Sequence, residues 1–262
     1  MSDQNKPRCA NDVDRHSTRV GSVDFEISNL DTASTTVLSL AVERVGVPVR
    51  LSNAYCVALA DKDLAYRSIL NGPGYTYPDG TPVAWFMNAK IKTRQAETVR
   101  GPSLFERCLD RGRSTGTRHF FLGTTPGTLE LLVSGCHRRF PGIEIAGTLA
   151  PPFAPIEDGM IQDIAEAIAE ADADVVWVAL GTPKQDFLAA RLAPRVERPC
   201  IGVGAAFDFL AGTTDEAPKW VQNSGMEWLY RFFKEPRRLW RRYLIGNVVF
   251  LKAATRELWR NR

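Results

Sequence analysis

The residues best suited to chemistry follow short apolar runs. FFL at 120–122 is followed by GTTPGT, and VAL at 178–180 by GTPKQD. In each turn a glycine permits a tight bend, and the following Thr and Pro suit the start of a helix. We therefore expect Thr182 to cap the helix that begins in GTPKQD. Exposed N–H groups at a helix start favour anions. One such turn is equally well explained as an ordinary strand–helix connection. Two of them, with the Gly-rich GVGAAFDF at 202–209, predict a nucleotide phosphate site.

A second candidate feature is the acidic turn in YPDGTPVAW at 77–85. Tyr-Pro-Asp-Gly is typical of a simple turn in which the Asp side chain caps the following residues. The flanking apolar and aromatic residues could instead hold the Asp79 carboxylate as a general base. The residues of this stretch alone leave both interpretations open.

Metal and dinucleotide chemistry are less well supported. The Asp-x-Asp triplets fall in the polar N-terminal stretch (Asp12–Asp14), on a solvated helix face (Asp61–Asp63) and before a strand (Asp172–Asp174), so we predict no metal site. The five cysteines lack CxxC spacing, which indicates reduced thiols in a cytoplasmic protein. Phe207 stands where a dinucleotide fingerprint requires its third glycine, which disfavours nicotinamide or flavin binding.

The elements that must position these residues alternate along the chain. Strands are expected at 45–53, 118–123, 143–150, 174–181 and 200–204, and helices at 54–70, 125–140, 158–171 and 184–194. This order predicts an α/β fold with a mostly parallel, Rossmann-like sheet flanked by helices. Ligands of such sheets bind beyond the carboxyl ends of the strands. The nucleotide is therefore expected near Gly123, Thr124, Gly181, Thr182, Gln185, Gly204 and Asp208, with Asp208 accepting ribose hydroxyls.

The charge of the chain is concentrated near its end. The net charge is +3 overall, but residues 227–262 alone carry +7, so the preceding part is mildly acidic. EWLYRFFKEPRRLWRRYL at 227–244 places aromatic residues on one half of a helix and basic residues on the other, which suits an anionic bilayer surface. Packing of this helix on its own domain is the alternative, and nucleic-acid binding lacks a reading motif.

The chain is accordingly divided into three parts. Residues 1–22 are expected to form a flexible polar tail, 23–226 an α/β catalytic domain, and 227–262 a basic, membrane-associating appendage. No run approaches the roughly 18 apolar residues of a transmembrane helix, and the N-terminus does not resemble a signal peptide.

Several motifs together resemble a known family. In chain order they are LSNAYCVALA, YPDGTPVAW, VRGPSLFERC, FFLGTTPGTLE, ALGTPKQDF, GVGAAFDFLAG, APKW and EWLYRFFKEPRRLWRRY, which span residues 51–244. They resemble the WecG/TagA/CpsF family of bacterial glycosyltransferases. The resemblance implies inverting, metal-independent transfer of a hexose, N-acetylhexosamine or uronic acid from a UDP-sugar to a polyprenyl-pyrophosphate-linked sugar. It also implies a peripheral location at the inner face of the cell membrane, a role in exopolysaccharide or cell-surface glycan synthesis, and no cofactor.

The resemblance assigns roles to individual residues. It implies that Asp79 is the catalytic base, that Gln185 and Asn53 line the active site, and that three arginines of the appendage complete it: Arg231, Arg238 and Arg241. Two positions depart from the family pattern, because Leu51 replaces a common Thr and Glu216 replaces a common Arg. The first change removes an expected pocket hydroxyl, and the second indicates a different acceptor or oligomer contact.

Two alternatives and one question remain open from the sequence. The chain could be a non-catalytic module that binds a nucleotide sugar or dinucleotide, or a nicotinamide oxidoreductase. The expected partners are a UDP-sugar, a lipid-linked sugar acceptor and an anionic membrane surface, with no nucleic acid. Whether the chain forms a homo-oligomer stays open.

Overall fold

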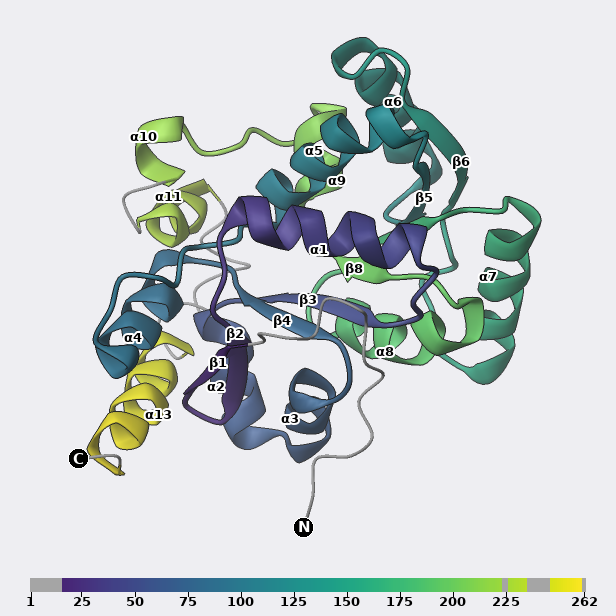
Figure 1. The fold of residues 1–262 in the computed structure, drawn as a ribbon. Helices are drawn as coiled ribbons and strands as arrows, with labels where there is room; N and C mark the ends of the chain where they lie inside the picture. The colour runs from purple at the N-terminus through teal and green to yellow at the C-terminus, as the bar shows by residue number, and fades with distance from the viewer. Residues whose placement is uncertain (1–15, 223–225, 235–245, 261–262) are drawn as a thin grey trace.

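The core of the fold is a twisted parallel sheet (Figure 1). The computed structural model describes residues 16–222, 226–234 and 246–260. In these ranges the sheet has six strands in the order β4-β3-β8-β7-β5-β6. Their bounds are β3 (Pro48–Ser52), β4 (Tyr75–Pro78), β5 (Arg118–Gly123), β6 (Glu144–Leu149), β7 (Val175–Ala179) and β8 (Cys200–Gly202). All neighbouring pairs are parallel, which confirms the predicted α/β class.

The central strands form because helices cover their apolar side chains on both faces. Every residue of β7 is buried, as expected for a continuous apolar run inside a parallel sheet. The edge strand β4 was missed by the sequence analysis, which interpreted its last two residues, Tyr77 and Pro78, as the start of a turn. Pro78 is its last residue, and an edge strand tolerates Pro because one side of its backbone needs no partner.

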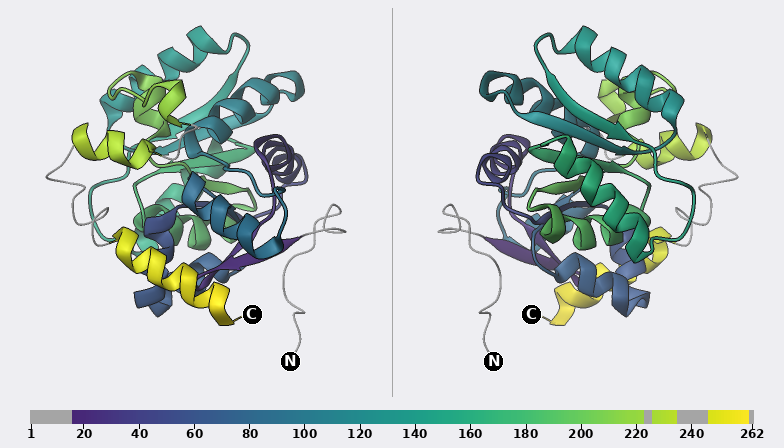
Figure 2. Two further views of the ribbon diagram at one scale, coloured as in Figure 1. Left: turned by 90° about the vertical axis from the view of Figure 1, so that its left-hand side faces the viewer. Right: turned by 90° about the vertical axis from the view of Figure 1, so that its right-hand side faces the viewer.

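Helices form a layer on each face of the sheet (Figures 1 and 2). The buried residues of the first layer come from α1 (Leu30–Val42), α5 (Gly101–Gly112), α6 (Pro126–Arg139) and α9 (Ala206–Ala211). Those of the second layer come from α7 (Asp158–Glu170) and α8 (Lys184–Val196). A third cluster joins α2 (Ala54–Lys62), α3 (Leu64–Asn71) and α4 (Thr81–Ile91) beside the sheet. The expected helix at 54–70 is thus two helices, since the Asp63 side chain caps α3.

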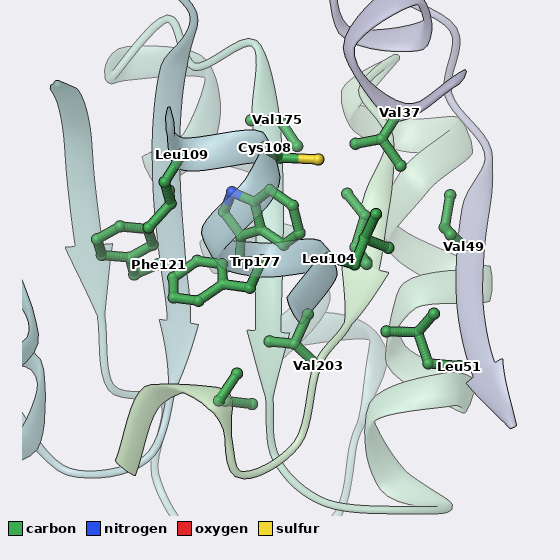
Figure 3. Close-up of a cluster of buried hydrophobic side chains, with 14 of the residues drawn as sticks. Val37, Val49, Leu51, Leu104, Cys108, Leu109, Phe121, Val175, Trp177 and Val203 are labelled. Carbon is green, nitrogen blue, oxygen red and sulfur yellow. The ribbon is translucent and has the colours of Figure 1, made fainter. Parts of the chain in front are cut away.

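The first layer holds the sheet through a dense aromatic core (Figure 3). Leu104 and Leu109 of α5 face Phe121 of β5 and Trp177 of β7. Phe105, also on α5, lies 5.0 Å from the Trp177 ring in an edge-on arrangement. Such pairs stabilise beyond their buried area. The packing ties α5 to the middle of the sheet and so fixes the strand ends at which ligands are expected.

The N-terminal part of the described chain is ordered earlier than expected. Residues 17–22 were assigned to a flexible tail, but Ser17–Val20 forms β1, which pairs with β2 (Val23–Glu26) in an antiparallel hairpin. Val20, Val23 and Phe25 are buried against α2 and α3. The hairpin is too short to give a strong alternating pattern, so only its tertiary contacts identify it.

The C-terminal part includes three described helices, α10 (Lys219–Gln222), α11 (Glu227–Lys234) and α13 (Gly246–Arg260). α13 packs against α2 and β1, and its Phe250 is buried edge-on against Phe86 of α4, with ring centroids 5.4 Å apart. The described part of the chain has no helix that is both long and apolar enough to span a membrane. Whether residues 227–262 act as a membrane-associating appendage stays a prediction.

Candidate active site at the carboxyl edge of the sheet

The expected site residues lie at one edge of the sheet because they follow neighbouring parallel strands. The topology changes direction between β5 and β7: β5 connects through α6 to β6 on one side, whereas β7 connects through α8 to β8 on the other. The helices α6 and α8 therefore start from adjacent strands but lie on opposite faces. Such a switch point opens the crevice in which α/β proteins bind ligands.

The exit of β5 is built so that the backbone passes very close to β7. Gly123 has φ +128°, and a Cβ at this position would lie 2.5 Å from the Ala179 carbonyl oxygen. The next residue, Thr124, has φ +56° and donates its N–H to the same oxygen over 3.1 Å. Thr125 then caps α6 by accepting the Thr128 N–H. This geometry excludes any other residue at 123 and directs the α6 N-terminus toward the crevice.

The exit of β7 reaches α8 through Gly181, Thr182 and Pro183. α8 begins at Lys184 with Pro183 at its N-cap and no side-chain cap, so the expectation that Thr182 caps this helix is wrong. The Thr182–Pro183 peptide bond is cis. In place of a cap, the Gln185 side chain folds back, and its Oε1 accepts the Gly181 N–H over 3.1 Å.

Gln185 also spans the neighbouring exit of β8. Its side chain is 3 % exposed, and its Nε2 lies 2.9 Å from where a Cβ of Gly202 would stand. Gly204 follows with φ +57°. Asp208 is half-buried on α9 and accepts a hydrogen bond from the Thr213 hydroxyl over 3.4 Å. Phe207, the residue that departs from the dinucleotide fingerprint, is fully buried between Phe105 and Phe121.

Asn53 and Asp79 follow adjacent strands at the same edge. β3 pairs with β4, and the Asp79 N–H donates to the Ser52 carbonyl over 3.0 Å, so the two residues stand side by side. Asn53 caps α2, because its Oδ1 accepts the N–H groups of Tyr55 and Cys56. Its Oδ1 is thus committed to the helix, which leaves the Nδ2 group as a donor for a ligand. Asp79 is half-buried.

Arg100 is a cation at this edge that the sequence analysis did not single out. Arg100 directly precedes α5, and its two neighbours contact the exits of β4 and β8. The Val99 N–H donates to the carbonyl of Pro78, the last residue of β4. A Cβ on Gly101 would lie 3.0 Å from the carbonyl oxygen of Val203, which follows β8. The Arg100 side chain is 9 % exposed and pairs with Glu216 over 2.7 Å. Glu216 is one of the departures from the family pattern, and its partner lies 116 residues away.

A buried acid, Asp186, was also missed. It is 2 % exposed in the first turn of α8, where its Oδ2 accepts the Tyr66 hydroxyl over 2.7 Å. Burial raises the pKa of Asp186 to about 6, although the Tyr66 hydrogen bond and the Arg50 charge act in the opposite direction. The only signal in the sequence is the position next to Gln185, and nothing there indicates burial.

The other departure from the family pattern, Leu51, lies in the apolar core of the sheet. Leu51 faces α5 in the apolar core, with its Cδ1 3.4 Å from a Cβ built on Gly101 (Figure 3). The neighbouring Ser52 therefore faces the other side of the sheet. Its hydroxyl is buried and lacks a hydrogen-bond partner among the described residues. Ser52 thus does not take the place of the hydroxyl expected at position 51.

The three arginines assigned from the C-terminal motif are only partly placed. Arg231 belongs to α11, while Arg238 and Arg241 lie outside the described residues. Their contribution to the site stays a prediction.

The acidic triplets do not form a metal site in the described chain. Asp172 and Asp174 pair with Arg118 over 2.6 and 3.0 Å at the amino edge of the sheet, opposite the candidate site. Asp63 caps α3, and Asp12–Asp14 lies outside the described residues. Over the described ranges, no three His, Cys, Asp or Glu side chains come together.

A surface groove of about 560 Å³ lies beside the start of α8. The loop after β6 and the first half of α8 line it with Phe153, Ala154, Pro155, Ile156, Lys184, Phe187 and Arg191. The Lys184 ammonium donates to the Ala154 carbonyl over 2.7 Å and lies over the Phe153 ring. This bond holds the loop after β6 next to the β7–α8 turn.

Comparison with known proteins gives one consistent result. The sequence model of the Glycosyl transferase WecG/TagA/CpsF family matches residues 18–262. Among curated proteins, the chain is similar to two enzymes named N-acetylglucosaminyldiphosphoundecaprenol N-acetyl-beta-D-mannosaminyltransferase. The one from Bacillus subtilis is 30 % identical over 77 % of each chain. The one from Bacillus spizizenii is 32 % identical over 68 % of this chain and 67 % of its own.

Proposed function

This chain belongs to the WecG/TagA/CpsF family and is a glycosyltransferase, and we propose that it acts on a polyprenyl-diphosphate-linked sugar. The proposed donor is a UDP-hexose, UDP-N-acetylhexosamine or UDP-uronic acid, and the proposed reaction inverts the anomeric centre without a metal ion. By analogy with the two relatives, an N-acetylhexosamine is the first donor sugar to test, and a diphosphate-linked N-acetylglucosamine the first acceptor. The product would enter exopolysaccharide or cell-surface glycan synthesis.

The observation that carries this proposal is the grouping of two chemistries at one sheet edge. The switch-point turns place the N-termini of α6 and α8 at this edge, where the positive ends of the helix dipoles favour a diphosphate. Asn53 lies at the exit of β3, which β8 alone separates from β7, and Asp79 lies at the exit of β4, one strand further out. A donor bound by its diphosphate at the turns could therefore direct its anomeric carbon toward the Asp79 carboxylate.

Inversion requires a single in-line displacement. The acceptor hydroxyl oxygen attacks the anomeric carbon, a glycosidic bond forms, and the bond from that carbon to the diphosphate oxygen breaks. The Asp79 carboxylate takes the hydroxyl proton, and UDP departs with the bonding electron pair. Asn53 Nδ2 is proposed to donate to a substrate oxygen next to Asp79.

Without a metal, the leaving diphosphate needs stabilisation from the protein. Helix N-termini and cations supply it when they are fixed before the reaction. Arg100 is the cation already at this edge, held by Glu216, and Arg231, Arg238 and Arg241 are proposed to add positive charge from the C-terminal segment.

Acceptor-dependent release of UDP tests the function directly. The protein is incubated with UDP-N-acetylhexosamines and UDP-hexoses, with or without a synthetic polyprenyl-diphosphate N-acetylglucosamine, and with or without EDTA. We expect UDP release and a disaccharide product only with the acceptor, and equal rates in EDTA. UDP binding without acceptor-dependent turnover would instead favour a non-catalytic nucleotide-sugar module. Loss of activity in EDTA would contradict metal independence.

The substrate also sets the proposed location. A polyprenyl-linked acceptor stays in the bilayer, so the enzyme must work at the membrane surface. We propose peripheral association with the inner face of the cell membrane through the basic and aromatic segment 227–244. Each basic residue near an anionic surface contributes about 1 kcal/mol. Self-association is a separate proposal, to be measured by sedimentation.

A further inference from the structure

A chain of buried polar side chains lies beneath the candidate site and joins two of its strand exits. At one end, the Cys56 thiol donates to Asn53 Oδ1 over 3.5 Å. The same thiol lies next to the Tyr66 hydroxyl. That hydroxyl donates its single hydrogen to Asp186 Oδ2 over 2.7 Å, so the thiol and the hydroxyl touch without sharing a hydrogen. Asp186 directly follows Gln185 in the sequence. The chain thus runs from the exit of β3 to the start of α8.

All three linking side chains are buried: Cys56 is 1 % exposed, Tyr66 fully buried and Asp186 2 % exposed. No substrate can reach them, so none is a catalytic residue. Burying a carboxylate costs free energy unless it is paired and hydrogen-bonded. A phenylalanine and an apolar side chain would fill the same space without that cost. The presence of the polar pair therefore calls for a reason other than packing.

We propose that Cys56, Tyr66 and Asp186 are positioning residues that hold Asn53 and Gln185 in register across the active site. α3 and α8 contribute Tyr66 and Asp186 and pack against each other, and the hydroxyl–carboxylate bond fixes one rotation of α8 about its axis. That rotation directs Gln185 Oε1 toward the Gly181 N–H. Cys56 lies between the same hydroxyl and the Asn53 amide group, whose Oδ1 it holds together with the cap N–H groups.

This inference rests on the proposed function for its kinetic readout but not for its structural one. Tyr66→Phe keeps the ring and removes the hydroxyl. We expect the Gly181 amide to exchange with solvent at least tenfold faster, because the Gln185 side chain loses its fixed position. We also expect kcat/KM on a soluble acceptor to fall roughly 10- to 100-fold, since a displacement of about 1 Å at a site can cost that much.

A pair of substitutions at Cys56 separates positioning from packing and does not depend on Tyr66→Phe being stable. Cys56→Ser keeps a donor toward Asn53, whereas Cys56→Ala keeps only the Cβ. We expect the Ser variant to retain kcat/KM within about threefold and the Ala variant to lose tenfold or more. The opposite order, with Ala the more active, would overturn the proposal, because an apolar residue is the better filler of a buried site.

The control is Val37→Ala on α1, which shortens a fully buried side chain on the face of the sheet opposite α8. It should lower the melting temperature by an amount comparable to Tyr66→Phe while leaving Gly181 exchange and kcat/KM unchanged. If the control changes both readouts as much as Tyr66→Phe does, the effect is global and the proposal is wrong. If wild-type protein shows no acceptor-dependent turnover, the proposed function fails, but the Gly181 exchange test still decides the role of the buried chain.

Discussion

At the scale of single residues, the candidate site combines half-buried side chains at the crevice edge with buried side chains that hold the backbone beside it. Asn53 and Asp79 follow adjacent strands at the crevice edge, while Gln185 turns inward to hold the Gly181 N–H. Arg100 brings the positive charge and Glu216 fixes it. A proton acceptor, a donor and a cation therefore occupy one edge, which is the minimum that an inverting transfer without a metal requires.

Asp79→Asn tests the base. The amide keeps the shape of the side chain and one acceptor oxygen but cannot take a proton, so kcat should fall by about 10²- to 10⁴-fold. UDP affinity by calorimetry should stay within about twofold, because the diphosphate is bound at other strand exits. Asp163→Asn, an exposed position on α7, is the matched control and should leave both quantities unchanged. Turnover near that of the wild type in Asp79→Asn would remove Asp79 from the mechanism.

At the scale of elements, the sequence correctly predicted the features that are determined by residues close together in the chain. The continuous apolar runs of β5 and β7 and the Gly-Thr turns after them indicated buried strands and their exits. β4 was missed because Tyr-Thr-Tyr-Pro lacks the aliphatic run of a central strand. Tertiary pairs were out of reach for a different reason: Tyr66 and Asp186 are 120 residues apart, and no local pattern indicates their contact.

The β8 exit gives a test of how elements shape the site. Gly202 has no unusual backbone angle, so Ala at this position is not strained, but its Cβ would press on Gln185, with Nε2 at 2.9 Å. We expect Gly202→Ala to displace the Gln185 side chain and weaken UDP binding by up to roughly tenfold, the value of about one hydrogen bond. Calorimetric titration with UDP measures it.

Gly212→Ala is the comparison for this variant. Gly212 has φ +73° with open space around it, so Ala there adds backbone strain without touching Gln185. It should lower stability while leaving UDP affinity unchanged. Equal UDP affinity in both variants would mean that Gln185 does not shape the nucleotide site.

At the scale of the whole molecule, two buried titratable groups, His119 and Asp186, have opposite effects on how the folding stability depends on pH. Burial lowers the pKa of His119 to about 4, and Trp177 reinforces the neutral form by donating to its Nδ1 over 3.0 Å. Since unfolded His titrates near 6.5, the unfolded state gains protons first, and stability is lost as pH falls from 6.5 to 4. Asp186 changes the stability in the opposite direction, because burial raises its pKa to about 6. Its stabilising contribution is fully present below about pH 3.8, the pKa of an unfolded Asp, and is lost as the pH rises to 6.

The two contributions should largely cancel between pH 4 and 6, each amounting to about 3 kcal/mol. His119→Asn keeps an acceptor for Trp177 but does not titrate, so its unfolding free energy should fall relative to wild type as pH rises through this range. Asp186→Asn should show a relative rise. Urea unfolding at a series of pH values measures both slopes, and parallel profiles for all three proteins would contradict the assignment.

The C-terminal helix changes how a tail deletion must be interpreted. Truncation at residue 226 would remove α13 together with the basic segment, and α13 is packed into the body: Phe250 is 2 % exposed against Phe86, and Ala254 is buried beside it. Phe250→Ala should therefore cost about 3–5 kcal/mol of stability, whereas Leu251→Ala, at a half-exposed neighbour, should cost less than about 0.5 kcal/mol. Lost activity after truncation would not by itself assign a catalytic role to the tail.

Point variants separate the two effects. Arg238→Ala should abolish turnover on a soluble acceptor with an unchanged melting temperature, because its proposed role is to neutralise the leaving diphosphate. Phe250→Ala should lower the melting temperature yet keep turnover when assayed well below it. Charge reversal at Arg237 and Arg242 should release the protein from anionic vesicles and spare the soluble reaction, since each basic residue near the surface contributes about 1 kcal/mol of binding. Full turnover in Arg238→Ala would leave the tail as an anchor only.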